Sequence, residues 1–268
     1  MTNPFSSIDR FPDLLKTFAF PLNVYAWCLY RETGRVGDLH YGFFEHPHES
    51  VELAQRRATD CVLRMLPQSG RILEIGVGLG TTLKRLLDTG FVARGITPEN
   101  QQAHLARILC GDEQAVELSS FEAFDNRAGQ WDILLFQESS QYIESRALFA
   151  KASSLLTPMG EVLVADEFAL TNRDDSSLHQ LSEFKEHSGQ SGFQLVAEYD
   201  ASDQAAFTVD FLLTMLEKHK LALLTEIGLT EAQLQHLYEA NQAYQRNYRE
   251  GCFGYWILKF RLDRIPEV

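Results

Sequence analysis

The sequence predicts an α/β fold, and three observations support that prediction. Between Arg71 and Asp166, short apolar runs alternate with amphipathic stretches, which is typical of βαβ units that feed a parallel sheet. The apolar residues of the intervening stretches recur at helical spacing, so each helix can cover the sheet. The first predicted strand runs directly into a glycine-rich turn and then into a helix. One large core of this kind fits a chain of 268 residues.

Seven segments have the apolar character of strands. They are residues 71–75, 91–97, 115–118, 131–137, 161–165, 193–199 and 254–261. We expect Thr157 to Gly160 to end the helix before the fifth strand, because proline cannot continue a helix and glycine relaxes the backbone that follows. A further helix is predicted over residues 177–189.

Residues 201–250 are predicted to be helical. Thr230 and Gln233 have the spacing of a capping box, and apolar and aromatic residues then recur at helical spacing. Such stripes are more often core than ligand-binding surface, so we interpret them as packing faces. The predicted organisation is an N-terminal helical cap at 1–60, an α/β core at 61–200 and 251–268, and a helical insertion at 201–250 that forms a lid.

The charge balance disfavours several classes of partner. Hydrophobic residues make up 45% of the chain, and 24 Lys and Arg stand against 37 Asp and Glu, for a formal net charge of −13. A field of this sign repels nucleic acid, and the sequence shows no basic patch that would override it. The longest apolar runs are far shorter than a membrane span requires.

The cysteines and the N-terminal residues indicate a cytoplasmic protein. The four cysteines lie far apart, without the CxxC or Cys/His spacing of a metal site, and we interpret them as reduced thiols. The first thirty residues lack the basic start and apolar run of a signal peptide. His46 and His48 flank a proline between two glutamates, and we favour a solvated turn over a metal site there.

The most specific motif joins the strand at residues 71–75 to a helix. It carries an acid, Glu74, and three alternate glycines, Gly76, Gly78 and Gly80. Glycine lets the chain turn tightly and lets a ligand approach the helix N-terminus, because a Cβ would obstruct both. The spacing is GxGxG, whereas dinucleotide-binding folds use GxGxxG, so a nicotinamide-dependent oxidoreductase is disfavoured.

The strand, the acid, the GxGxG turn and the helix together resemble the first motif of class I S-adenosylmethionine-dependent methyltransferases. The resemblance implies a Rossmann-like fold, with a doubly wound, mostly parallel seven-stranded sheet and helical caps. It also implies S-adenosyl-L-methionine as the cofactor and methyl transfer as the reaction. A glycine-rich turn in another kind of α/β protein remains the alternative.

A second segment, residues 95–102, ends the second strand and opens the next helix. It resembles the GxTxxxxQ stretch of the cyclopropane fatty acid synthase-like branch, which holds the cofactor ribose. Most other methyltransferases carry an acid at this strand end, where this chain has Thr97. The ribose hydroxyls are expected to meet Thr97, Gln102 or backbone groups. Glu99 is a further candidate, and it could equally cap the helix.

Residues 38–45 lie before the glycine motif and include His40 and Tyr41. They look like the HxGYW segment of methyltransferases that act on sugars, tocopherols, sterols, amines and fatty acyl chains, in which it forms part of a lid over cofactor and acceptor. By itself such a short aromatic string is more often the packed end of a helix. The resemblance places both side chains at the catalytic centre.

Residues 136–143 follow the fourth strand, at the edge where open α/β sheets bind ligands. The string lacks the Asn/Asp-Pro-Pro-Tyr motif of amino-group methylation and resembles a segment of tocopherol-type and prenyl-diphosphate C-methyltransferases. Glu138 is therefore predicted to face the cleft, where a carboxylate can stabilise a developing cation or accept a proton. The alternative is that Glu138 caps the following helix.

An acid that this family often carries after the third strand is missing. That acid binds the adenine amino group, and this chain instead has Ser120 and Phe121, which could accept one hydrogen bond and flank the ring. A catalytically inactive binding or assembly module that retains the fold is therefore kept as the second interpretation.

The resemblance implies an enzyme that methylates a small molecule, such as a lipid-like compound or a secondary metabolite, at carbon or oxygen. Glu138 would stabilise a cation for a carbon acceptor, and His40 would act as the base for an oxygen acceptor. A homodimer is left open. The residues expected at the cofactor are Tyr41, Glu74, Gly76, Gly78, Gly80, Thr97, Gln102, Ser120, Phe121 and Gln137, and those expected at the catalytic centre are Glu138, His40 and Tyr41.

Overall fold

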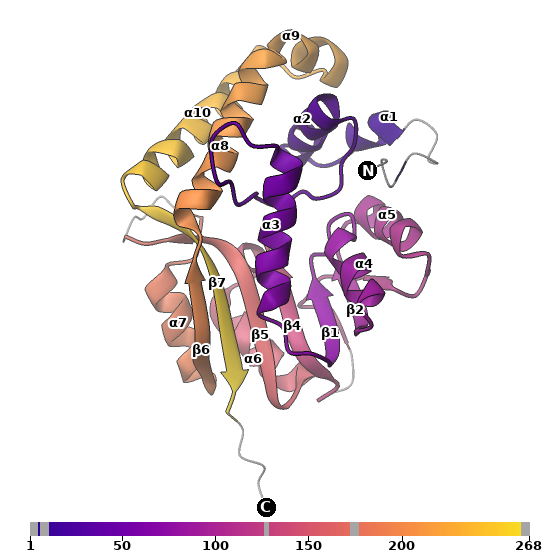
Figure 1. Ribbon diagram of the computed structural model, residues 1–268, viewed down its shortest axis with the longest axis vertical. Helices are drawn as coiled ribbons and strands as arrows, with labels where there is room; N and C mark the ends of the chain where they lie inside the picture. Colours follow the sequence, from indigo (N-terminus) through magenta and orange to yellow (C-terminus); the bar gives the residue numbers. More distant parts are fainter. Residues whose placement is uncertain (1–4, 6–10, 126–128, 172–176, 264–268) are drawn as a thin grey trace, which may run out of the picture. The chain divides into compact units, whose positions relative to one another are not determined.

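The chain forms two compact units in the computed structural model, which describes Phe5 and residues 11–125, 129–171 and 177–263 (Figure 1). The sheet unit consists of Thr59–Ser202 and Cys252–Val268, and the helical unit consists of Met1–Ala58 and Asp203–Gly251. Each unit is therefore assembled from two stretches that are distant in the sequence.

The sheet unit is built on one seven-stranded sheet with the order β3-β2-β1-β4-β5-β7-β6. Its strands are β1 (Arg71–Ile75), β2 (Val92–Thr97), β3 (Val116–Leu118), β4 (Trp131–Gln137), β5 (Leu156–Ala169), β6 (Phe193–Asp200) and β7 (Phe253–Leu262). Pairs from β3 to β5 run parallel, and β7 pairs antiparallel with both β5 and β6. The predicted α/β class with a doubly wound, mostly parallel sheet is confirmed. Its switch point lies between β1 and β4, where such sheets bind ligands.

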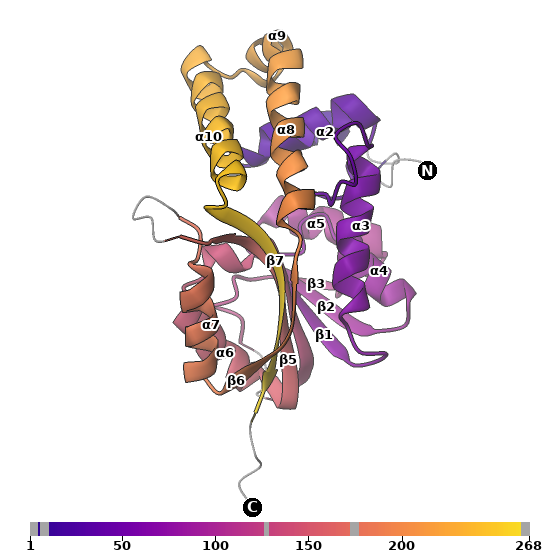
Figure 2. The same ribbon diagram turned by 60° about the vertical axis from the view of Figure 1, so that its left-hand side comes forward.

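Helices cover both faces of this sheet, as Figure 2 shows. On one face lie α6 (Ser145–Leu155) and α7 (Leu181–Gln190), and on the other lie α4 (Thr81–Asp88) and α5 (Asn100–Cys110). A short 3-10 helix, η1 (Ser140–Tyr142), follows β4. Because β1 and β4 are adjacent and parallel, the segments that follow them leave the sheet side by side, at the carboxyl ends of the strands.

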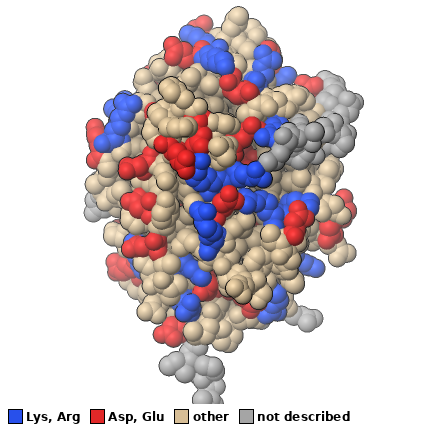
Figure 3. Space-filling model, viewed as in Figure 1, with Lys and Arg blue, Asp and Glu red and all other residues tan. Residues whose placement is uncertain are grey.

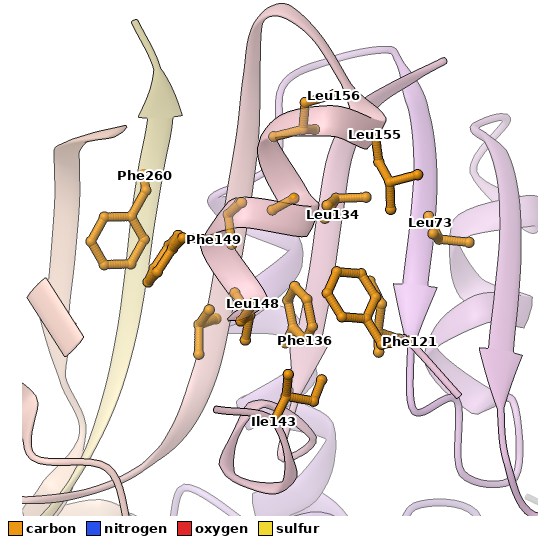
Figure 4. Close-up of a cluster of buried hydrophobic side chains, with 14 of the residues drawn as sticks. Leu73, Phe121, Leu134, Phe136, Ile143, Leu148, Phe149, Leu155, Leu156 and Phe260 are labelled. Carbon is orange, nitrogen blue, oxygen red and sulfur yellow. The ribbon is translucent and has the colours of Figure 1, made fainter. Parts of the chain in front are cut away.

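Aromatic rings fill the space between the sheet and the α6–α7 layer (Figure 4). The ring centroid of Phe149 lies 5.0 Å from that of Phe184 and 5.2 Å from that of Phe260, and all three side chains are almost completely buried. Burying one such ring contributes about 2–3 kcal/mol, so this layer stabilises the strands whose ends carry the candidate site.

The helical unit is held together by apolar helix faces. It contains α1 (Phe11–Leu15), α2 (Leu22–Thr33), the first part of α3 (Val51–Arg64), most of α8 (Ser202–Lys218), α9 (Lys220–Ala222), the π-helical turn η2 (Leu223–Ile227) and α10 (Glu231–Arg249). The predicted capping box is confirmed, because Thr230 and Gln233 exchange side-chain to backbone hydrogen bonds of 3.0 and 3.2 Å. Trp27, Met215 and Leu237 belong to one buried cluster, so the stripes are packing faces.

Two predicted boundaries near β5 are wrong. The helix α6 does end before Thr157, but Thr157 to Gly160 belong to β5 and form no loop. The register between β4 and β5 shifts between Trp131 and Ile133, and a bulge of this kind tolerates proline inside a strand. The helix predicted over residues 177–189 begins later, at the start of α7.

Two surface properties bear on the classes of partner. No helix in the described part of the chain is long and apolar enough to cross a membrane. On the face that Figure 3 shows, acidic and basic side chains are interspersed, although the formal net charge of the chain is −13. The acidic excess is therefore not gathered into a single field on this face.

Candidate active site

The three glycines between β1 and α4 have left-handed backbones, with φ of 78° at Gly76, 52° at Gly78 and 84° at Gly80. A Cβ on Gly76 would lie 2.5 Å from the Cβ of Ser139, and a Cβ on Gly80 would lie 2.7 Å from the Cβ of Ala106. A Cβ on Gly78 would meet no described atom within 4 Å beyond its chain neighbours. The packing of the protein itself thus requires Gly76 and Gly80, whereas Gly78 borders open space in which a ligand can lie.

The end of β2 brings two of the predicted cofactor residues together. Thr97 is almost fully buried, and its hydroxyl donates to Oε1 of Gln102 at 3.2 Å. The same hydroxyl oxygen accepts from the backbone N–H of Glu99 at 3.3 Å. Glu99 occupies the N-cap position of α5, but its side chain makes no capping hydrogen bond. Thr97 and Gln102 therefore form one polar pair at this strand end.

The end of β3 is occupied by contacts within the protein. The hydroxyl oxygen of Ser120 accepts from the backbone N–H of Ala123 at 3.2 Å. The Phe121 ring is 3% exposed, and its centroid lies 5.3 Å from that of Phe136 in an edge-on contact. Contacts of Ser120 and Phe121 with an adenine ring stay predictions, and the packing of Phe121 gives it a core role at the same time.

Glu138 stands directly after β4 in a backbone conformation that favours glycine, with φ of 55°. Its N–H donates to the carbonyl oxygen of Ala165 at 2.8 Å, which extends the β4–β5 ladder by one residue. Glu138 is not the N-cap of either helix that follows it, because Ser139 is the N-cap of η1 and Glu144 is the cap of α6, where its carboxylate accepts from the N–H groups of Arg146 and Ala147. A strained position held by its surroundings is typical of functional residues.

Tyr255 on β7 holds the Glu138 side chain. Its hydroxyl donates to Oε1 of Glu138 at 2.9 Å, and the Tyr255 side chain is fully buried. Burial, followed by the charges of Glu138 and Asp166, raises the pKa of the Tyr255 hydroxyl well above its ordinary value of 10. Tyr255 therefore stays protonated and remains a donor. No pattern in the sequence marks Tyr255, because it lies 117 residues from Glu138 and no local spacing links the two.

Asp166 on β5 fixes the turn that follows Glu138. It is fully buried, and its Oδ2 accepts from the N–H of Ser140 at 3.0 Å, the hydroxyl of Ser140 at 2.6 Å and the N–H of Gln141 at 3.2 Å. Burial raises the pKa of Asp166 above its ordinary value, while the Ser140 hydroxyl and backbone N–H groups oppose that rise. His179 Nε2 lies 3.0 Å from the Ser140 carbonyl oxygen. No motif in the sequence marks Asp166 either.

Two further predicted cofactor residues are buried beside the glycine turn. Glu74, the last but one residue of β1, is 2% exposed, and Gln137, the last residue of β4, is 8% exposed. Oε1 of Gln137 accepts from the hydroxyl of Thr82 at 3.0 Å, in the first turn of α4. Nε2 of Gln137 is buried and has no hydrogen-bond partner among the described residues.

His40 and Tyr41 belong to the helical unit, in the segment 38–45. The Nδ1 atom of His40 lies 2.7 Å from the carbonyl oxygen of Tyr41, to which it donates, and Nε2 lies 3.4 Å from Oδ1 of Asp38. Both ring nitrogens are therefore directed at partners in their own unit. The predicted roles of His40 as a base and of Tyr41 at the cofactor stay predictions.

The segment 38–45 is fixed by backbone hydrogen bonds inside the helical unit. The N–H of Gly42 donates to the Thr208 hydroxyl at 3.0 Å, and that hydroxyl donates back to the Gly42 carbonyl at 3.2 Å. The N–H of Phe43 donates to the Ala54 carbonyl at 2.9 Å. A Cβ on Gly42 would lie 2.7 Å from the Cβ of Ala54, so glycine here permits close contact with α3.

The histidines after this segment are exposed, and both neighbouring acids, Glu45 and Glu49, form ion pairs with Arg57. Arg57 donates to both carboxylate oxygens of Glu49, at 2.8 and 2.6 Å. The Arg57 guanidinium lowers the pKa of Glu49 from 4.5 to about 2. Among the described residues, no group of three or more His, Cys, Asp or Glu side chains is arranged to hold a metal ion.

Neither a family model nor a curated protein sequence matches the chain. Solved structures do match. The [4+2]-cyclase SpnF is 18% identical over 88% of this chain and 93% of its own, with a TM-score of 0.71. The cyclopropane synthase MmaA2 from Mycobacterium tuberculosis is 18% identical over 83% of this chain and 89% of its own, with a TM-score of 0.71.

A third match is geranyl diphosphate C-methyltransferase from Streptomyces coelicolor A3(2), whose structure contains Mg2+, geranyl diphosphate and S-adenosyl-L-homocysteine. It is 16% identical over 83% of this chain and 91% of its own, with a TM-score of 0.63. Likeness at these identities shows the fold. The expected class I methyltransferase fold is confirmed.

Proposed function

We propose that this chain is an S-adenosylmethionine-dependent methyltransferase that acts on a small molecule. The observation that carries the proposal is the environment of Gly78, which stands in a left-handed turn at the switch point of the sheet and borders open space. At Gly76 and Gly80, by contrast, other parts of the protein occupy the space where a Cβ would lie. A turn of this shape at the start of a helix is suited to a ligand with a charged end.

The residues present fit the cofactor at two strand ends. In the Thr97–Gln102 pair after β2, the Thr97 hydroxyl already donates to Oε1 of Gln102 and accepts from Glu99, so the side-chain amide of Gln102 is the group that can donate to a ribose hydroxyl. The turn at Gly78 leaves room for the amino-acid end. When bound, S-adenosyl-L-methionine supplies an electrophilic methyl group on a sulfonium. The protein then has to align the acceptor with that methyl group and exclude water.

Glu138 is the residue best placed to act on the acceptor. The Tyr255 hydroxyl fixes one carboxylate oxygen, and the hydrogen bond from Glu138 N–H to Ala165 fixes the backbone. A carboxylate fixed before the reaction can stabilise positive charge that develops on a carbon acceptor, or accept the proton that such an acceptor loses. An oxygen acceptor with His40 as base would require His40 to exchange a contact with Tyr41 or Asp38 for one with the substrate.

A binding or assembly module with this fold is the second candidate. It is favoured by the end of β3, where the Ser120 hydroxyl oxygen is used by Ala123 and the Phe121 ring belongs to the core. One structural neighbour, SpnF, is described as a cyclase, so the fold also supports reactions other than methyl transfer.

Isotope transfer tests the proposal. The protein is incubated with a fraction of small metabolites and S-adenosylmethionine that carries a trideuterated methyl group, and products are examined by mass spectrometry. We expect at least one metabolite to gain the mass of the labelled methyl group in the presence of the protein, and to gain none with a heat-denatured sample. A chain that binds the cofactor and labels nothing in lipid, amine and phenolic fractions favours the module.

A further inference from the structure

Tyr142 is an aromatic residue beside Glu138 to which the proposed mechanism gives no task. It is the last residue of η1, and it is 80% exposed. We infer that the methyl acceptor carries an ammonium group, which binds against the Tyr142 ring and faces the carboxylates of Glu138 and Glu167. The inference rests on the proposed function and deepens it, because it assigns a charge class to the acceptor.

The first argument is that η1 presents the Tyr142 ring on a fixed backbone. Ser140 at the start of η1 is fully buried, and Ile143 directly after it is 6% exposed and belongs to the core cluster (Figure 4). The N–H of Ile143 donates to the Ser140 carbonyl at 3.0 Å, which closes the turn. An exposed ring on a fixed turn loses little conformational freedom when a ligand packs on it, so this ring is suited to binding.

The second argument is the sign of the charges around the ring. Glu138 directly follows β4, and Asp166 and Glu167 lie on β5, which is the strand beside it. Desolvation, followed by the charges of these three carboxylates, raises the pKa of the Tyr142 hydroxyl above its ordinary value of 10. The ring is open to solvent, while protein at longer range weakens the solvation of its hydroxyl. A ligand that packs on this ring therefore enters a negative potential.

The third argument is the position of Glu167, which is 6% exposed. It lies opposite Tyr255 in the antiparallel ladder of β5 and β7, and residues opposite each other have side chains on the same face of a sheet. The Tyr255 hydroxyl donates to Glu138 at 2.9 Å, so the carboxylates of Glu138 and Glu167 are brought to one face of the sheet unit. After burial, the charges of both glutamates contribute to the raised pKa of Tyr255.

The positive charges of the same strands lie away from this end of the sheet. In β4, β5 and β7 the basic residues are Lys259 and Arg261, and they pair with Glu161 in the first half of β5, at 2.9 and 3.0 Å. Burial raises the pKa of Asp166, and the charge of His179 is among the opposing causes. Asp166 uses its oxygens on η1 and on a backbone N–H of β5, so His179 acts on a carboxylate that is not offered to a ligand.

An ammonium group is the ligand that fits these features together. Its charge is attracted by carboxylates, and alkylated ammonium groups pack on the faces of aromatic rings. A phosphate or carboxylate on the acceptor would be repelled, and a neutral acceptor would gain nothing from the second carboxylate. The sulfonium of the cofactor is also a cation, so the experiment has to distinguish it from the acceptor.

Calorimetric titration of the full chain with choline and with 3,3-dimethylbutan-1-ol tests the inference. The two probes have nearly the same shape, but choline carries a quaternary ammonium where the alcohol carries a neutral carbon. With the chain saturated by S-adenosyl-L-homocysteine, we expect choline to bind at least about tenfold more tightly than the alcohol, because only choline carries the charge. Equal affinities, or binding of neither probe, overturn the inference.

Variants of Tyr142 assign the preference to the ring. Tyr142→Leu keeps an apolar side chain and should lower the affinity for choline by about fivefold or more, whereas Tyr142→Phe keeps the ring and should stay within about twofold of wild type. Tyr199→Leu removes another exposed tyrosine, on β6, and is the matched control that should leave choline binding unchanged. Choline affinity that Tyr142→Leu leaves intact overturns the inference.

Glu167→Gln separates the acceptor from the cofactor. It should weaken choline by about tenfold and change the affinities for S-adenosylmethionine and S-adenosyl-L-homocysteine by less than about twofold. A loss for S-adenosylmethionine alone, with choline unchanged, assigns Glu167 to the sulfonium and overturns the inference. The Tyr142 variants carry the test if Glu167→Gln does not fold. A wild-type chain that binds neither cofactor form overturns the proposed function as well, whereas normal cofactor binding without a preference for choline overturns the inference alone.

Discussion

Two regions of the molecule differ in how many of their polar groups are already hydrogen-bonded within the protein. One is formed by the carboxyl ends of β1 and β4, here called the strand edge, and the other is the segment 38–45. At the strand edge, Gly78 borders open space and the Gln137 amide nitrogen is unpartnered among described residues. In the segment 38–45, the N–H groups of Gly42 and Phe43 are bonded to α8 and α3, and both ring nitrogens of His40 face partners. The ends of β1 and β4 thus keep a polar group and open space for a ligand. The segment 38–45 has already used its polar groups in hydrogen bonds within its own unit.

The same difference separates the two candidate catalytic groups. Glu138 is fixed by Tyr255, whose hydroxyl stays protonated because burial raises its pKa well above its ordinary value of 10. His40 instead lies between the Tyr41 carbonyl and the Asp38 carboxylate. A group fixed by a donor that does not titrate is ready for a substrate, whereas a histidine held at both nitrogens must first give up a contact.

The largest effect is expected at Gly78. Gly78→Val should reduce S-adenosylmethionine affinity by at least about a hundredfold, because the branched side chain occupies the open space and strains a left-handed backbone. Gly111→Val is the matched control, since Gly111 also has a left-handed backbone, with φ of 70°, and open space where a Cβ would lie, but it is the C-cap of α5 and not part of the turn. Titration calorimetry on both folded variants measures the difference. Equal affinities in the two variants would contradict the assignment of the turn.

The next effect concerns turnover. Glu138→Gln should lower kcat by at least about a hundredfold with cofactor binding intact, while His40→Gln should have a mild effect. Steady-state kinetics with the acceptor found by isotope transfer measures both. The reverse order of effects would identify an oxygen acceptor with His40 as base, and small effects at both positions would mean that alignment of the two ligands suffices.

A smaller effect is expected from the residue that holds Glu138. Tyr255→Phe keeps the ring in the sheet and removes the hydroxyl, so kcat should fall by about tenfold while the affinity for S-adenosylmethionine changes little. Combining it with Glu138→Gln provides the control, because the two losses should not add if Tyr255 acts through Glu138. Additive losses would assign Tyr255 a separate role.

The smallest effect is a pH dependence of stability in the helical unit. The pKa of Glu49 is lowered from 4.5 to about 2 in the folded chain, so its pair with Arg57 stabilises the protein fully above about pH 4.5 and loses that contribution as the pH falls to about 2. Glu49→Gln should therefore lower the free energy of unfolding at neutral pH, with a difference from wild type that shrinks between these values. Glu45, which is exposed and 3.3 Å from Arg57, gives the control variant Glu45→Gln. A constant difference across this range would show that the pair is not the cause.

The sequence predicted the elements that depend on local pattern. The strand β1, the glycine turn and the strand β4 lie where apolar runs and glycines indicated, because a buried parallel strand must be apolar and a left-handed turn favours glycine. The proximity of Thr97 and Gln102 is also predictable from the sequence, because Gln102 follows Thr97 by five residues at the start of a helix.

The contacts that hold Glu138 could not be predicted in this way. Tyr255 and Asp166 reach the end of β4 only because β5 lies beside β4 and β7 lies beside β5, which is a property of strand order and not of spacing in the sequence. The start of β5 was missed for a related reason. A bulge allows Thr157 to Gly160 to remain in the strand, and proline and glycine alone indicate a loop.

Titration of the wild-type chain with S-adenosylmethionine, with NADH as the competing ligand, tests the central claim most directly. The open turn at Gly78 and the Thr97–Gln102 pair predict saturable binding of one S-adenosylmethionine per chain and no binding of NADH. Absence of binding to S-adenosylmethionine, or binding of NADH in preference to it, would contradict the claim that this strand edge is a methyltransferase cofactor site.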